Sequence, residues 1–170
     1  MDAIIGTTRV EHAWNVLAEV PDPEVPAISV CDLGVVRNVI DAGEMLEVVL
    51  TPTYSGCPAL RVIEEDIIEA LTASGLAPVR VETVYAPAWT TDWLSAAAKQ
   101  KLEQYGIAPP GPAVRQSLVR LTRAAVAEHP CCPYCGSHDT TVRSEFGSTA
   151  CKAICYCKGC EQPFELFKAI

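Results

Sequence analysis

Apolar residues recur at helical spacing in two stretches of the first hundred residues. Between Thr8 and Val20 an apolar side chain returns every three or four positions until Pro21, which predicts an amphipathic helix. A second helix is expected from residue 60 onward, with Gly75 as its C-cap and a solvated acidic side. Its apolar side is expected to consist of Leu60, Ile63, Ile67, Ile68 and Leu71.

Three runs rich in β-branched residues predict strands between and after these helices. Residues 35–40 and 46–51 are separated by Asp41-Ala42-Gly43-Glu44, a short connection with a glycine that is typical of a hairpin. Residues 79–85 form the third run, and Thr91 with Asp92 can cap a last short helix that ends at Tyr105-Gly106. This order predicts an α+β fold in which helices and one sheet form two layers.

The chain changes character after residue 107. Residues 108–112, Ala-Pro-Pro-Gly-Pro, are incompatible with regular structure, and residues 114–125 repeat apolar positions at helical spacing. The arginines of this predicted helix are either solvated charges or a docking face for an acidic partner. We expect a larger domain over residues 1–107, a proline-rich linker and helix over 108–129, and a small cysteine-rich module over 130–170.

Charge divides the chain at about the same place. Residues 1–110 contain 6 Lys and Arg against 16 Asp and Glu, and residues 111–170 contain 7 against 5. The larger domain therefore repels nucleic acid, and the positive excess of the remainder is too small for phosphate-driven binding. The start lacks a basic, apolar leader, and no run approaches the roughly 18 apolar residues that span a bilayer, so we expect a cytoplasmic protein without a membrane segment.

Seven of the nine cysteines lie from Cys131 onward. A reducing cytoplasm disfavours disulfides, so closely spaced thiols indicate metal ligands or reactive groups. Two Cys-x-x-Cys pairs, Cys132/Cys135 and Cys157/Cys160, are separated by 21 residues. Each pair presents two thiolates from one tight turn, and two such turns together form the tetrahedral sulfur site that structural zinc prefers.

Strands expected over residues 140–144, 150–156 and 163–167 complete a zinc ribbon, in which metal binding would supply most of the folding energy. Four thiolates also suit a single iron ion or an iron–sulfur cluster, and the sequence leaves zinc and iron both open. Further thiols could compete as ligands, as could a nearby histidine: Cys131, Cys151, Cys155 and His138.

A second group of chemically active residues lies in the larger domain. Asp22, Glu24 and Asp32 fall between the first helix and the first strand, and Cys57 lies in a polar loop before the second helix. The positive end of that helix is expected to lower the pKa of the Cys57 thiol and to favour a thiolate suited to soft metals or nucleophilic attack. In a plainer interpretation, Cys57 is a small buried residue and the carboxylates cap turns.

Residue patterns of several other site classes are missing from the sequence. It contains no Ser/His/Asp set, no glycine-rich nucleotide loop, no His-Glu-x-x-His motif and no Glu-x-x-His pair for a di-iron centre. The three histidines fall in unrelated segments. The sequence itself therefore gives no support for hydrolytic, flavin-dependent or oxygenase chemistry in this chain.

Two motifs of the larger domain resemble a known family. DPEVPAISVCDLG (residues 22–34) and TPTYSGCP (residues 51–58) resemble the FSCA-like iron–sulfur cluster assembly domain of SufT and of eukaryotic cytosolic iron–sulfur targeting factors, over about residues 9–106. Together with APAWTTDW, CPYCGS, SEFGSTACKA and CEQPFELFK, they are similar over nearly the whole chain to the PaaD family, a component of the bacterial ring-1,2-phenylacetyl-CoA epoxidase system.

The resemblance implies a non-enzymatic maturation factor for the oxygenase that epoxidises phenylacetyl-CoA in aerobic phenylacetate breakdown. Cys57 would accept or relay iron or an iron–sulfur cluster, and Asp22, Glu24 and Asp32 match the acidic positions of the motif. The recipient would be an iron–sulfur reductase subunit of the epoxidase system. One cysteine offers too few ligands, so a homodimer or a ternary complex is expected to supply the others. Cys31 adds a second thiol beside Asp32.

The competing hypothesis is a structural accessory subunit of the oxygenase that makes no transient metal contact. Replacing Cys57 separates the two hypotheses, because only the maturation factor requires that thiol. A nucleic-acid-binding ribbon is a third class, which the net charge of −8 disfavours.

Overall fold

The computed structural model describes residues 8–111 and 129–169 of the 170-residue chain. It divides into two compact units, Met1–Trp89 and Thr90–Ile170, and each is described by itself. The predicted linker helix at residues 114–125, with Arg115, Arg120 and Arg123, lies outside the described residues. Within the described part, every helix is too short or too polar to cross a bilayer.

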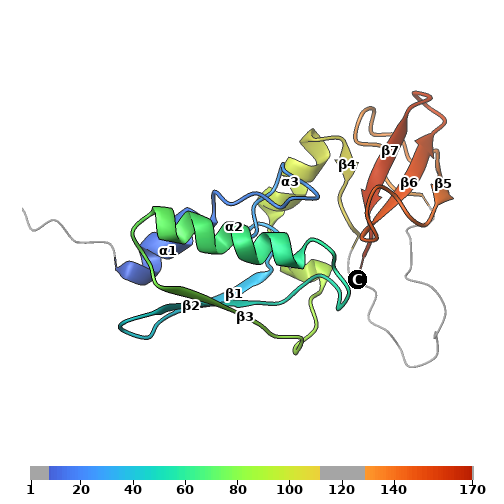
Figure 1. Ribbon diagram of the computed structural model, residues 1–170. Coiled ribbons are helices and arrows are strands. Elements are labelled where there is room, and N and C mark those ends of the chain that lie inside the picture. Colours follow the sequence, from blue (N-terminus) through green and yellow to red (C-terminus); the bar gives the residue numbers. More distant parts are fainter. Residues whose placement is uncertain (1–7, 112–128, 170) are drawn as a thin grey trace, which may run out of the picture. The chain divides into compact units, whose positions relative to one another are not determined.

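The first unit is a two-layer α+β fold. Its elements follow the order α1 (Arg9–Leu17), β1 (Val36–Asp41), β2 (Leu46–Leu50), α2 (Leu60–Ala73) and β3 (Val79–Thr83). The central strand β2 is antiparallel to β1 and parallel to β3, and both helices lie on one face of the sheet (Figure 1). The predicted fold class is confirmed.

Local interactions define where these helices begin and end. Thr8 and Glu11 form a capping box, in which each side chain accepts a hydrogen bond from the backbone N–H of the other residue. The end of α2 is a Schellman motif, because Gly75 has a φ of 79° and Leu76 N–H donates to the carbonyl of Leu71. The predicted C-cap is therefore confirmed.

The core of the first unit lies between α2 and the sheet. Ile63, Ile67 and Leu71 repeat along α2 at helical spacing and are at most 5% exposed. The sheet contributes alternate residues of β2, which are Leu46, Val48 and Leu50. The expectation that Ile68 also faces the core is wrong, because this side chain lies further around the helix and is 39% exposed.

The second unit contains a four-stranded sheet in the order β4-β7-β6-β5. Its strands are β4 (Ile107–Ala108), β5 (Thr140–Ser144), β6 (Lys152–Cys157) and β7 (Pro163–Phe167), of which β5, β6 and β7 are the predicted ribbon strands. Ala108 was expected outside regular structure, and this expectation is wrong. It pairs with Leu166 of β7 and is 1% exposed in the ribbon core.

The helix before β4 begins later than expected. Thr90 caps a single 3₁₀ turn, η1 (Thr91–Trp93), and Ser95 then caps α3 (Ala96–Gln104) by accepting a hydrogen bond from Ala98 N–H. After α3, Gly106 has a φ of 88°, and a Cβ there would lie 2.8 Å from the Tyr134 hydroxyl of the ribbon. Close packing of Tyr134 on Gly106 explains why this position lacks a side chain.

Replacing Ile67 by alanine is expected to lower the free energy of unfolding of the first unit by about 3 kcal/mol, because the fully buried side chain leaves a cavity under α2. The matched control is Val62→Ala on the exposed side of the same helix, which should change stability by less than about 0.5 kcal/mol. Urea denaturation followed by tryptophan fluorescence measures both. Equal effects of the two substitutions would contradict the described orientation of α2.

Candidate functional site

Four sulfur atoms of the second unit converge on one point. The Sγ atoms of Cys132, Cys135, Cys157 and Cys160 all lie within 4.8 Å of one another. The Cys132–Cys160 distance is 3.7 Å and the Cys135–Cys157 distance is 3.5 Å. Four sulfurs around a tetrahedral zinc at a Zn–S distance of about 2.3 Å would be about 3.8 Å apart, so the donor set fits this metal.

Backbone hydrogen bonds hold the two cysteine turns together. Gly136 has a φ of 73° and donates its N–H to the Cys132 carbonyl at 2.9 Å, which closes the first turn. Lys158 N–H of the second turn donates to the Asp139 carbonyl at 2.8 Å. A Cβ on Gly159 would lie 3.1 Å from Ser137 Oγ, so glycine permits the close approach of the two turns. Sequence reasoning missed Gly159, although its place between two cysteines was a usable signal.

The four thiols do not ionise together without a cation. Backbone N–H groups, first that of Cys160, lower the pKa of Cys157 to about 7. Burial and the neighbouring thiols raise the pKa of Cys160 to about 12. A divalent metal ion removes this conflict, because it stabilises the negative charge on all four sulfurs at once.

The competing ligands considered from the sequence lie outside this group. Cys155 is fully buried in the apolar ribbon core, and burial raises its pKa to about 11. Cys151 contacts the Thr149 hydroxyl at 3.0 Å, Cys131 lies 3.5 Å from the Gly136 carbonyl, and His138 is exposed. None of the nine cysteines forms a disulfide.

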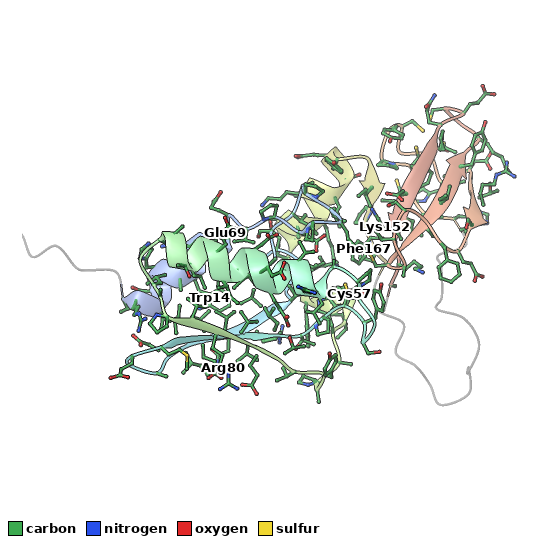
Figure 2. All side chains as sticks on the ribbon, in the orientation of Figure 1. Trp14, Cys57, Glu69, Arg80, Lys152 and Phe167 are labelled. Carbon is green, nitrogen blue, oxygen red and sulfur yellow. The ribbon has the colours of Figure 1, made fainter. Side chains whose placement is uncertain are left out.

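Cys57 lies at the N-terminal end of α2, as the sequence predicted (Figure 2). Its backbone N–H donates to the Tyr54 carbonyl at 3.2 Å, and its carbonyl accepts from Leu60 N–H at 3.3 Å. No side chain caps α2, because the N-cap residue is Ala59. The backbone N–H groups of Ala59 and Leu60 act to lower the pKa of the half-exposed Cys57 thiol, so the sulfur lies where a capping group would.

The expectation that Cys57 has a lowered pKa is wrong. Burial is the largest influence and raises the pKa, and the negative charges of Glu24 and then Asp22 raise it further. The N–H groups at the start of α2 lower it, as predicted, but they are outweighed. The thiol is therefore mainly protonated at neutral pH, and it lies close enough to two acidic residues to sense their charge.

Two of the predicted acidic residues shape the loop before β1. Asp22 is 5% exposed, and its Oδ1 accepts hydrogen bonds from Glu24 and Val25 N–H at 2.8 and 2.7 Å. Asp32 and Ser29 bond reciprocally, each side chain accepting from the other's N–H at 3.1 and 3.0 Å. The plainer interpretation of these carboxylates as turn caps therefore describes part of what Asp22 and Asp32 do.

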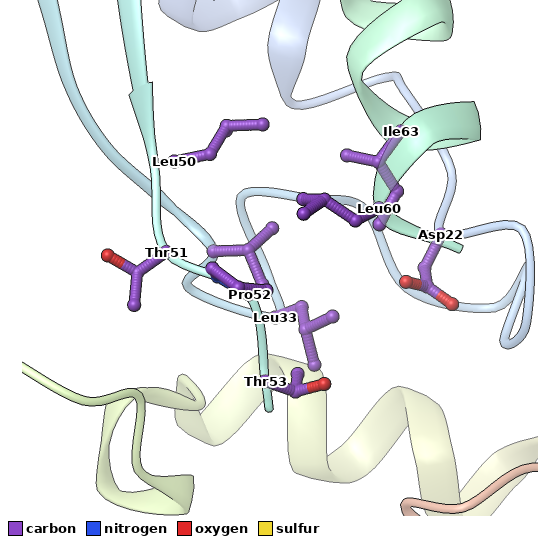
Figure 3. Close-up of a pocket in the computed structure, with 9 residues that line it drawn as sticks. Asp22, Leu33, Leu50, Thr51, Pro52, Thr53, Leu60 and Ile63 are labelled. Atoms are coloured by element: carbon purple, nitrogen blue, oxygen red, sulfur yellow. The ribbon is translucent and has the colours of Figure 1, made fainter. Parts of the chain in front are cut away.

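A small pocket lies beside the first turn of α2. Figure 3 shows the Asp22 carboxylate near Leu60, with Thr53 and Leu33 on the opposite wall. The space open to the centre of a water molecule is about 10 Å³, which is room for about one water. The pocket is too small for an organic substrate, and it leaves the Cys57 loop as the chemically active feature of this end of the unit.

The four-cysteine group is the only convergent set of three or more metal-binding side chains among the described residues. Cys57, Asp22, Glu24 and Asp32 therefore form no closed ligand cage. Burial and then Asp32 raise the pKa of Cys31 to about 11, which makes it a poor nucleophile. The second unit thus carries a closed four-sulfur site, and the first unit carries the half-exposed Cys57 thiol in acidic surroundings.

Adjacent cysteines provide a test of the four-sulfur site. Cys132→Ser is expected to lose the zinc that purifies with the protein, because three sulfurs leave the tetrahedron incomplete. Cys131→Ser, one residue away and outside the group, should keep one zinc per chain. Elemental analysis of both purified variants measures the zinc content per chain. Equal zinc contents would show that Cys132 is not a required ligand.

The raised pKa of Cys57 predicts slow alkylation. At pH 7 to 8 iodoacetamide should modify Cys57 more slowly in the native than in the urea-unfolded chain, because less thiolate is present. Glu24→Gln removes a nearby negative charge and should raise the native rate severalfold, whereas Glu44→Gln at the β1–β2 hairpin should not. Peptide mass spectrometry resolves the individual cysteines. Faster alkylation in the native chain would overturn the described electrostatics.

Both units of the chain match known protein families. Residues 117–168 match the PaaD zinc beta ribbon domain, and residues 11–85 match the family described as iron–sulfur cluster assembly protein. A protein of Porphyromonas gingivalis named "Fe-S protein maturation auxiliary factor" is 34% identical over 54% of this chain and 89% of its own length. A crystal structure of the domain of unknown function DUF59 from Bacillus anthracis has a TM-score of 0.53 and 26% identity, covering 59% of this chain and 97% of that one.

One relative extends over both units. A protein of Escherichia coli, whose name describes it as a component of 1,2-phenylacetyl-CoA epoxidase, is 45% identical over 99% of this chain and 98% of its own length. The likeness therefore includes the assembly-type domain, the ribbon and the segment between them. The chain belongs to the PaaD family, which joins an iron–sulfur assembly-type domain to a zinc ribbon.

Proposed function

We propose that this chain is a maturation factor for the phenylacetyl-CoA epoxidase system, which delivers iron or an iron–sulfur cluster to a protein of that system. The cargo binds transiently to Cys57, and the recipient is the iron–sulfur reductase subunit. Cys132, Cys135, Cys157 and Cys160 hold a structural zinc and take no part in transfer. The factor works in the cytoplasm and catalyses no oxygenation itself.

The observation that carries this proposal is the contrast between the two cysteine sites. The ribbon offers four convergent sulfurs, which suits a permanently bound metal. Cys57 is one half-exposed thiol that belongs to no convergent set of three or more metal-binding side chains among the described residues, and it lies in the domain that matches iron–sulfur assembly proteins. A site with one ligand leaves most coordination positions of its cargo to the donor or the recipient, and this suits transfer.

The acidic surroundings of Cys57 support a positively charged cargo. When the thiol binds iron(II), the S–H bond breaks, an Fe–S bond forms, and the proton passes to solvent or to a carboxylate. Glu24 and Asp22 disfavour a free thiolate but attract the incoming cation. The carboxylates therefore keep the empty site protonated and favour its loaded form.

Cys57→Ser, which replaces the thiol sulfur by oxygen, tests the proposal. In cells that produce the epoxidase system, Cys57→Ser should cause a severalfold deficit of iron and acid-labile sulfide in the purified reductase subunit. The substitution should leave the zinc content of this chain unchanged, because Cys57 lies outside the four-sulfur group. Iron, sulfide and zinc analyses measure these quantities.

Cys31→Ser is the matched control, because it removes another partly buried thiol from the same unit. It should leave the cluster content of the reductase normal. The name of the Escherichia coli relative, that of an epoxidase component, favours the competing role of a structural accessory subunit. A normal cluster content with Cys57→Ser would establish that role instead.

A further inference from the structure

One outer edge of the first unit's sheet is regular and has no neighbouring strand among residues 8–111 and 129–169. β3 pairs with β2 on one side only, and its register runs without a bulge from Val79 to Thr83. Other edges in the described part of the chain are blunted: β1 and β5 each have an irregularity, and β4 has two residues. Bulges and short length are two of the devices that protect natural edge strands, and β3 has neither of them.

The hydrogen-bonding groups of this edge follow from the parallel register. Leu46 N–H donates to the Pro78 carbonyl, and Val84 N–H donates to the Leu50 carbonyl. In this pattern the N–H and C=O groups of Arg80 and Glu82 point toward β2. Those of Val79, Val81 and Thr83 therefore point out of the sheet, where they can accept another strand.

We infer that β3 pairs antiparallel with β3 of a second copy of this chain, about a two-fold axis through Val81, to form a continuous six-stranded sheet. In this register Val81 faces Val81 of the second copy as a hydrogen-bonded pair. Arg80 then faces Glu82 of the second copy at a non-hydrogen-bonded position, where side chains approach most closely. The two-fold axis repeats this ion pair, so the strand is complementary in charge to itself.

The two charged side chains of β3 are available to form these pairs. Arg80 and Glu82 are exposed, and no described residue forms an ion pair with either. Figure 2 shows Arg80 on the face of the sheet away from α2. The opposite face carries Thr83, whose hydroxyl donates to Glu64 of α2 at 2.6 Å.

The exposed Ile68 lies where the same axis would pass. α2 runs antiparallel to β3, and Glu64 marks the level of Thr83. Val81 lies two residues before Thr83, which is about 7 Å along the strand. The same distance along α2 is about four or five residues, so the helix residue level with Val81 is at about position 68. Ile68 is on the same side of α2 as Glu64, so the Ile68 side chains of two copies would meet beside the axis and become buried.

This dimer has a consequence for Cys57 that rests on the proposed function. The C-terminal ends of the two β3 strands lie on opposite sides of the axis, with the Thr83 residues about 14 Å apart. Each Cys57 lies in the loop that follows the C-terminal end of β2, so the two thiols face away from each other. The dimer would carry two independent cargo sites, and the remaining ligands would come from donor or recipient proteins.

Charge reversal on the full chain tests the pairing. Sedimentation analysis of the unaltered protein should show a dimer, and Arg80→Glu or Glu82→Arg alone should weaken it about tenfold by placing like charges opposite each other. An equimolar mixture of the two variants should form a heterodimer, and the double variant should dimerise again. Glu44→Arg at the hairpin is the charge control and should dimerise normally.

Amide hydrogen exchange adds a second measurement. The amides of Val81 and Thr83 should be protected in the dimer and exchange quickly in Arg80→Glu, whereas those of Arg80 and Glu82 should be protected in both. A protein that is still monomeric at about 100 µM would overturn the inference, because its dissociation constant would be well above this concentration. Single charge reversals that leave the dissociation constant of the dimer unchanged would also overturn it. Neither outcome bears on the cluster assay with Cys57→Ser.

Discussion

Negative charge on sulfur is the constraint on which both cysteine sites depend. In the ribbon, four thiols within 4.8 Å of one another ionise together only around a cation, so metal and fold stabilise each other. The apolar cluster beside them is small and includes two of these four residues, Cys132 and Cys157. Because Ala108 of β4 also packs into this cluster, the stability of α3 and β4 is linked to the metal.

The same electrostatics has the opposite outcome at Cys57. Here one sulfur meets N–H groups that favour a thiolate, together with burial and two carboxylates that disfavour it. Together these influences raise the pKa, so the empty site keeps its proton. Only a bound cation makes the thiolate the favoured form. Sulfur is thus the ligand atom of both sites. The four-cysteine site is closed and binds its metal continuously, whereas Cys57 is open and binds only when a cation arrives.

Much of this arrangement could be predicted from the sequence, since it depends on local spacing. Helical periodicity located α2, and Gly75 indicated its end, because both depend on neighbours within a few residues. The pairing of Ala108 with Leu166 was missed because it joins segments far apart in the chain. The direction of the Cys57 pKa was also missed, because the helix end is visible in the sequence while the burial of the loop and the approach of Glu24 are not.

The charges of the acidic residues 1–110 are distributed unevenly between the Cys57 site and the edge strand β3. The carboxylates of Glu24 and Asp22 near Cys57, in a part of the chain with a surplus of negative charge, attract cations and repel polyanions, which agrees with a role in handling metal. Within β3, however, Arg80 and Glu82 alternate on one face, so the same acidic unit has an edge that is neutral and complementary to itself. The distribution of charge thus separates a surface for cations from a surface that a second copy can approach without repulsion.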